Sequence, residues 1–264
     1  MKSLGKFAGA VLAVSVAAAA SAAPITYLGN GTGPGGVPVA ASATFDIVGD
    51  NLTITLRNTS GSNSGQDVPG STLSGLFWDF TGSPTLTPVS AMLAPGSSII
   101  GAACSPASCV GVTNVGGEFG YEATSFPGGA DRGISSSGYL DTGLTGNRGN
   151  FNNGAGGVNL DSPVSLDGIN FGIVSAASGF NPNLGLASVP LVQDAVVFLL
   201  TGASGLTNAD ISNVSFQYGT ALTELNVPGD DGGGGGGGPL PEPASLALVA
   251  VALVAAARFG RARG

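Results

Sequence analysis

The chain has 264 residues, of which 43% are hydrophobic and 9% are charged, with 46 glycines, a formal net charge of −8 and no histidine. The absence of histidine excludes Ser-His-Asp and Cys-His catalysis, and it excludes zinc or copper sites built on imidazole. The acidic balance argues against nucleic acid and anionic lipid surfaces as partners.

The first 22 residues have the pattern of a secretory signal peptide. Lys2 and Lys6 precede an apolar run over residues 7–20, and the small-residue sequence Ala-Ser-Ala ends at Ala22. We therefore predict cleavage after Ala22 and export of the chain that follows. The alternative is a retained N-terminal anchor, which the short run and the small residues at its end disfavour.

Residues 23–228 are predicted to form one exported domain. Between residues 23 and 240 the chain carries three basic and fifteen acidic residues and no lysine, a net charge of −12. Such a charge suits cations or basic polymers as partners, or serves solubility alone. About 200 residues suffice for one domain with its own core, and the regular apolar runs argue against global disorder.

Alternating apolar residues predict β-strands throughout this domain. Residues 52–57 alternate strictly between apolar and polar side chains, and Gly49 and Asp50 supply a hairpin turn after a strand over 43–48. Four further segments place apolar residues on one strand face: Leu76, Trp78 and Phe80, opposite Asp79; Ile169, Phe171 and Ile173; Val196, Phe198 and Leu200; and Val214, Phe216 and Tyr218. No amphipathic helix of ten or more residues is found. The pattern predicts an all-β fold, an antiparallel β-sandwich or jelly roll.

Residues 116–159 are less regular and are predicted to be long loops between strands. Aromatic residues are spaced between glycines in this region: Phe119, Tyr121, Phe126, Tyr139 and Phe151. Long loops on a rigid sandwich often carry binding sites. The plainer interpretation, which we favour, is that these aromatic residues anchor the loops to the core.

Carboxylates are the acid and base candidates that remain without histidine. Glu118 and Glu122 are four residues apart, which in a strand places both side chains on one side, where a glycosidase-like pair could form. Two solvated loop acids are the simpler interpretation. Calcium ligation is a weaker prediction, because no D-x-D-x-D-G loop accompanies the acids considered for it: Asp161, Asp167, Asp230 and Asp231.

Cys104 and Cys109 are the two cysteines of the chain. In an oxidising compartment, a pair this close in sequence predicts one disulfide that clips a surface loop. Such a small loop would contribute roughly 2 kcal/mol to stability in the chain-entropy model.

The last 36 residues divide into a linker and a three-part tail. The linker, residues 229–238, includes seven consecutive glycines and is predicted to be a flexible coil with a reach of about 15 Å. The tail, residues 239–264, has a Pro-Glu-Pro tripeptide, an uncharged apolar run over 244–257, and three arginines: Arg258, Arg261 and Arg263. A helix over the run would span roughly 21 Å. It is therefore predicted to be a weak transmembrane anchor with its C-terminus in the cytoplasm, and the alternative is a buried helix of a soluble protein.

This order of parts resembles the PEP-CTERM sorting signal of exosortase-dependent bacterial surface proteins. Pro241, Glu242 and Pro243, the apolar span and the terminal arginines match that signal part for part. The resemblance implies export, transient tethering in the inner membrane of a Gram-negative bacterium, and recognition by exosortase, a membrane-embedded protease or transpeptidase. Members of the family are often associated with exopolysaccharide and biofilm matrix. Residues 192–224 also look like a recurring end of β-sandwich domains in such proteins, and this likeness carries no functional residue.

Taken together, we expect an exported surface or extracellular-matrix protein with a structural or adhesive role and no enzymatic activity. The expected partners are exosortase, exopolysaccharide, and the membrane through the C-terminal helix before processing. Neither a cofactor nor nucleic acid is expected. Two alternatives stay open: a carbohydrate- or calcium-binding module that uses the middle loops, and a secreted carbohydrate-active enzyme that uses carboxylates.

Overall fold

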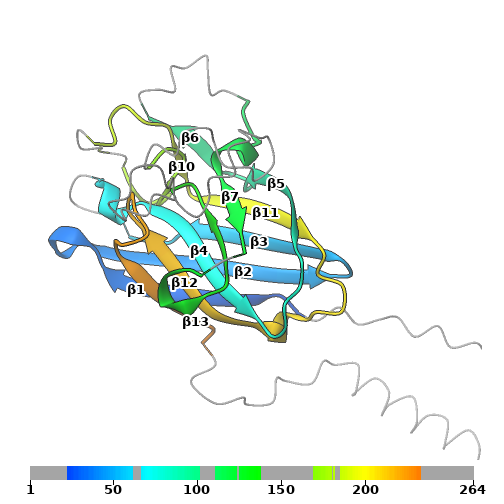
Figure 1. The fold of residues 1–264 in the computed structure, drawn as a ribbon. Helices are drawn as coiled ribbons and strands as arrows, with labels where there is room; N and C mark the ends of the chain where they lie inside the picture. The colour runs from blue at the N-terminus through cyan, green and yellow to red at the C-terminus, as the bar shows by residue number, and fades with distance from the viewer. Residues whose placement is uncertain are drawn as a thin grey trace, which may run out of the picture.

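The computed structural model describes residues 23–61, 67–101, 111–123, 125–137, 169–179, 181 and 185–232. This part of the chain is built of β-strands and short 3₁₀ turns, so the all-β prediction is confirmed at this level (Figure 1). The strands are β1 Ile25–Thr32, β2 Pro38–Val48, β3 Asn51–Asn58, β4 Leu73–Phe80, β5 Thr87–Leu93, β6 Ser98–Ile100, β7 Gly120–Glu122, β8 Arg132–Ser135, β9 Ile173–Val174, β10 Leu191–Gln193, β11 Ala195–Thr201, β12 Ile211–Tyr218 and β13 Asn226–Asp230. The 3₁₀ turns are η1 Pro34–Gly36, η2 Pro69–Ser71, η3 Gly116–Glu118, η4 Pro127–Gly129 and η5 Asn208–Asp210. Across the described ranges, no helix is long and apolar enough to cross a membrane.

The β2–β3 hairpin forms as its sequence predicts. Val48 pairs with Asn51 across a two-residue turn, and Gly49 within that turn has a φ of 63°. Glycine adopts this left-handed conformation without steric cost, which is why a Gly-Asp turn closes a tight hairpin here. Along β3, every second side chain from Leu52 to Leu56 is buried.

The strands join into one sheet in the order β5-β11-β3-β2-β1-β13-β12-β4-β9-β10-β6, and β8 pairs with both β4 and β7. All neighbouring strands are antiparallel except β9 and β10, which are parallel. Strand β13 pairs with β1 on one side and with β12 on the other. The two halves of the sheet are therefore joined by backbone hydrogen bonds, which a sandwich of two separate sheets would not have.

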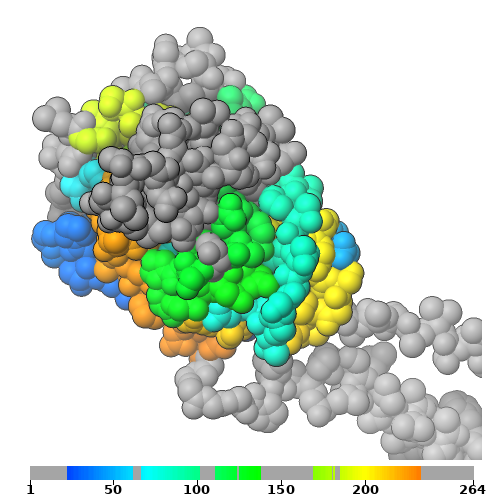
Figure 2. All heavy atoms as spheres, in the orientation of Figure 1, coloured from blue at the N-terminus to red at the C-terminus, as the bar shows by residue number. Residues whose placement is uncertain are grey.

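The free edge of β5 is partly covered. Met92 of β5 forms a bridge with Asn114, and the Val115 amide donates to the Ala91 carbonyl. The chain continues from there through η3 into β7, which pairs with β8 and so connects to β4. In Figure 2 the green surface of this part of the chain lies directly beside the blue-green surface of β5. The sheet is thus nearly closed, and we call the region between β5 and β7–β8 the seam.

The core lies between the two halves of this folded sheet. Phe45 of β2 contacts Trp78 of β4 edge to face, with ring centroids 5.8 Å apart. Phe119 packs in the same way against Phe198 of β11, at 5.1 Å. All four side chains are fully buried. The inward faces predicted for β4, β11 and β12 are confirmed, since the three apolar residues predicted to face inward on each strand all join this one cluster.

One predicted strand is wrong over most of its length. Ile169, Phe171 and Ile173 do not share a strand face, because β9 begins only at Ile173. The residues before it form a turn in which the Gly172 amide donates to the Ile169 carbonyl, and Phe171 has a φ of 56°. Ile169 therefore packs in a separate small cluster with Val174 and its neighbours. An alternating pattern interrupted by glycine suits such a turn as well as a strand.

Aromatic residues of the middle region anchor loops wherever the structure describes them. Phe119 lies in the main core, and Tyr121 packs against it. Phe126 stacks on Phe77, on the other face of β4, with ring centroids 4.8 Å apart. Gly133 permits this contact, because a Cβ there would lie 2.7 Å from the Phe77 ring and 3.1 Å from Phe126. The anchoring interpretation is confirmed for these three residues.

The two ends of the described chain lie at the same end of the sheet. Leu28 of β1 pairs with Asp230 of β13, so Ala23 and Gly232 both extend beyond that pair in the same direction. Burial, and to a smaller extent the negative charge of Asp231, raises the pKa of Tyr27, in line with this proximity. Strand β13 also runs to Asp230, two residues past the boundary expected at residue 228.

Candidate functional site

Many of the residues singled out in the sequence lie outside the described part of the chain. The signal peptide over residues 1–22 and the tail over residues 239–264 are among them. So are the following residues: Cys104, Cys109, Tyr139, Phe151, Asp161, Asp167, Pro241, Glu242, Pro243, Arg258, Arg261 and Arg263. The functional residues predicted within the described ranges are Glu118, Glu122, Asp230 and Asp231.

Glu118 and Glu122 do not occupy equivalent positions on one strand. Glu118 lies in η3, because β7 begins only at Gly120, whereas Glu122 is the last residue of β7. Glu122 pairs with Gly133, which faces Phe77 and Phe126. Cross-strand partners share a face. Glu122 therefore faces away from the main core, and no hydrogen bond among the described residues joins it to Glu118.

Burial raises the pKa of both carboxyl groups, that of Glu118 and that of Glu122. A carboxyl that protonates more readily in the folded protein binds an extra proton on folding, so its contribution to stability falls as pH rises above the ordinary glutamate range. At neutral pH, each charged group therefore opposes folding. A raised carboxyl pKa also suits a general acid, and a glycosidase needs two carboxylates that flank one substrate. Glu118 in η3 and Glu122 at the end of β7 do not share the strand face predicted for such a pair.

Replacing Glu118 with Gln should stabilise the protein at neutral pH, because the neutral amide avoids the desolvation of a carboxylate. The gain in melting temperature over the wild type should grow as pH rises from 4 to 7, as followed by circular dichroism. Asp50→Asn provides a control of opposite sign. Hydrogen bonds, chiefly from the Ser204 hydroxyl, lower the pKa of Asp50, so this variant should lose stability at neutral pH and match the wild type in acid. A Glu118→Gln gain that is the same at pH 4 and pH 7 would contradict the assignment.

Arg132 is a buried cation that sequence reasoning missed. Its residue is only 4% exposed, and it lies opposite Trp78 on the core face shared with Ile134. The guanidinium forms an ion pair with Asp131 and donates from Nη2 to the Pro84 carbonyl, at 3.0 Å. It also lies 5.7 Å from the centroid of the Phe80 ring. Residues two apart in a strand share a face, so the apolar Ile134 in β8 was a sequence signal that Arg132 faces the core as well.

Among the residues that the structure describes, no hydrogen-bond partner is found for three buried atoms near the seam: Nε1 of Trp78, the hydroxyl of Tyr121 and Nε of Arg132. The Trp78 and Tyr121 ring centroids are 6.3 Å apart. Burial raises the pKa of Tyr121 to about 12. The interior beside the seam therefore contains polar groups, and Arg132 links β8 to the β4–β5 connection there.

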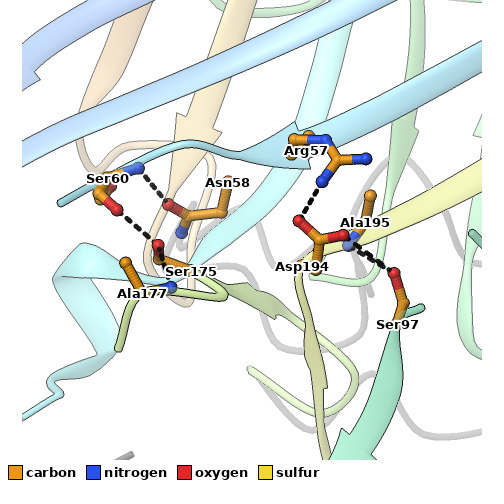
Figure 3. Close-up of polar contacts among 8 residues, drawn as sticks. All are labelled: Arg57, Asn58, Ser60, Ser97, Ser175, Ala177, Asp194 and Ala195. Atoms are coloured by element: carbon orange, nitrogen blue, oxygen red, sulfur yellow. Dashed lines mark hydrogen bonds and ion pairs between the residues drawn. The ribbon is translucent and has the colours of Figure 1, made fainter. Parts of the chain in front are cut away.

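A second cluster of polar residues lies at the C-terminal end of β3 (Figure 3). Arg57 forms an ion pair with Asp194, the residue between β10 and β11, whose φ is 91°. The Ser97 hydroxyl contacts both Asp194 and the first residue of β11. It donates to Oδ2 of Asp194 at 3.4 Å and accepts from the Ala195 amide at 3.1 Å. These contacts hold a strained backbone position where the chain passes from β10 to β11.

Asn58 extends this network towards β9. The residue is 2% exposed; Nδ2 donates to the Ile173 carbonyl at 2.8 Å, and Oδ1 accepts from the Ser60 amide at 3.1 Å. The Ser175 hydroxyl in turn donates to the Ser60 carbonyl. Each of these groups is used within the protein, so the network cross-links β3, β9 and the loop after β3.

The acids considered for calcium form no site in the described ranges. Asp230 Oδ1 accepts a hydrogen bond from the Gly232 amide at 2.9 Å. Nowhere in this part of the chain do three or more histidine, cysteine or acidic residues gather closely enough to hold a metal ion.

Two polar regions of the described residues, the seam around Arg132 and the network around Asn58 and Asp194, thus connect strands. Comparison with known proteins adds no relative: no family model matches the chain, and no curated protein or solved structure matches it.

Proposed function

We propose that this chain is an exported bacterial surface or extracellular-matrix protein of the PEP-CTERM type, with a structural or adhesive role. In this proposal the leader is removed after Ala22 and exosortase processes the tail at Pro241, Glu242 and Pro243. The β-domain, residues 23–232, is a sandwich-like module of mainly antiparallel strands that is displayed outside the cytoplasm. Exopolysaccharide is the proposed matrix partner.

This proposal rests on the resemblance of the tail to the sorting signal, and the position of the two ends of the β-domain supports it. Strand β1 begins at Ile25, shortly after the expected leader cut at Ala22, and β13 ends at Asp230, next to the glycine run of the linker. Both ends leave from one end of the sheet. A domain whose ends lie together can be tethered to a membrane at that end while its opposite end points away.

The internal use of polar groups supports a structural role. The network around Asn58 and Asp194 ties neighbouring segments together through hydrogen bonds to backbone groups and through one ion pair. Buried polar groups that are fully satisfied in this way rigidify a fold.

Replacing Pro241, Glu242 and Pro243 together with alanine tests the proposal in the native host. The substitution removes two rigid residues and a charge and lets the helix extend towards the linker. The full-length species should then accumulate in the inner membrane, and surface or matrix material should disappear, as measured by fractionation and C-terminal mapping.

Two further variants sharpen this test. Pro239→Ala, a proline outside the tripeptide, should be processed like the wild type. Replacing Arg258, Arg261 and Arg263 should instead cause leakage or misorientation, because the positive charges fix the topology. Normal processing of the triple-alanine variant would show that the tripeptide is not a sorting determinant.

A further inference from the structure

The side chain of Asn208 holds the first residue of the β-domain. The β1–β2 ladder ends at the pair Ile25 and Phe45, and Pro24 has no amide hydrogen with which to extend it. Beyond that pair, the Asn208 side chain joins β2 to the residue before Pro24: Oδ1 accepts from the Ile47 amide at 2.9 Å, and Nδ2 donates to the Ala23 carbonyl at 2.7 Å. The Asn208 amide thus stands where a peptide group would continue the ladder.

Neighbouring hydrogen bonds hold these two contacts of the Asn208 side chain, which we call the clamp, in place. Asn208 is 4% exposed and begins η5. Asp210 Oδ2, at the end of η5, accepts from the Thr207 amide at 2.8 Å and from the Thr207 hydroxyl at 2.9 Å. The next residue, Ile211, accepts a hydrogen bond from the Tyr27 hydroxyl at 2.7 Å. The start of β1 is therefore tied to the start of β12 at two points.

This arrangement leaves no spacer between the expected leader cut and the fold. The bond between Ala22 and Ala23 is followed at once by a residue whose carbonyl is hydrogen-bonded to a buried side chain. A protease must draw several residues on both sides of its target bond into an extended conformation, so a tied segment is cut only when it opens. The tail differs, because residues 231–240 separate the end of β13 from Pro241.

We propose that the fold itself imposes an order on processing, which rests on the leader and tail proposed above. The leader is removed before β1 docks against β2 and Asn208, and a precursor that folds first becomes a poor substrate for signal peptidase. The tail remains a substrate for exosortase after folding. Folding therefore separates the two cuts in time.

The test uses the full chain in detergent micelles, incubated with purified signal peptidase either folded or freshly diluted from urea. The unfolded wild type should be cut after Ala22, and the folded wild type should be cut at least about tenfold more slowly. A variant with Gly-Ser-Gly-Ser inserted between Ala23 and Pro24 keeps the Asn208 side chain and moves the cut away from the clamp. When folded, it should be cut nearly as fast as unfolded chain. The matched control carries the same insertion after Gly232 and should behave like the wild type.

The outcomes are distinct. If folded and unfolded wild type are cut at equal rates, or if the insertion before Pro24 leaves the folded protein resistant, the processing order is overturned while the leader proposal stands. If even unfolded wild type is not cut, the leader proposal itself fails, and the processing order fails with it.

Discussion

Trp78→Ala should lower the free energy of unfolding by about 3–5 kcal/mol, the range measured for large aromatic residues removed from cores. Trp78 is fully buried and lies between the halves of the sheet, where it contacts Phe45 of β2 and Tyr121 of β7. Its removal leaves a cavity that neither half can fill without bending its strands. Since a typical domain is stable by only about 5–15 kcal/mol, much of the fold's stability depends on this one side chain.

Trp78→Phe is the matched control. Nε1 of Trp78 has no hydrogen-bond partner in the described part of the chain, so the replacement loses no hydrogen bond seen there and only part of the ring volume. We expect a loss of at most about 2 kcal/mol. Urea denaturation followed by circular dichroism compares the variants, because Trp78 is the chain's one tryptophan and fluorescence would be lost. Equal losses for the two variants would mean that a specific role of the indole nitrogen, rather than ring volume, stabilises the core.

Gly202→Ala should also be strongly destabilising, for a reason that lies in the backbone. Gly202 follows β11 with a φ of 95°, and a Cβ there would lie 2.2 Å from the Thr85 carbonyl oxygen. The left-handed conformation costs an alanine about 1–2 kcal/mol. Relief of the clash must move the β4–β5 connection, which adds about 1–3 kcal/mol, as overpacking does elsewhere.

Gly205→Ala separates these two costs within the same loop. Gly205 has a φ of 84°, and no atom lies within 4 Å of a Cβ built there. It should therefore show the conformational cost alone. The difference in free energy of unfolding between the two variants, measured by urea denaturation, gives the cost of the close approach to Thr85. If Gly205→Ala is as damaging as Gly202→Ala, the contact between the β11 end and the β4–β5 connection is not what limits substitution.

Much of the candidate site was beyond sequence reasoning. Glu118 and Glu122 were found as a carboxylate pair, but their environment depends on where β7 begins and on which face Gly133 lies. Asn208 lies in an Asn-Ala-Asp turn, which reads as an ordinary surface turn. Its role appears only when β1 and β2, more than 150 residues earlier in the chain, lie beside it.

The sequence alone determined the local features of this protein. The β2–β3 hairpin and the inward faces of β3, β4 and β11 follow from a period of two and from a Gly-Asp turn, which are properties of neighbouring residues. The choice of strand partners is not local. β11 and β12 are close in sequence and similar in pattern, yet β11 pairs with β3 and β5 while β12 pairs with β4 and β13. Backbone hydrogen-bonding groups are the same for every residue type except proline, so they do not select strand partners by themselves. The packing of the whole core decided that β13 joins the two halves and closes a sandwich pattern into one nearly continuous sheet.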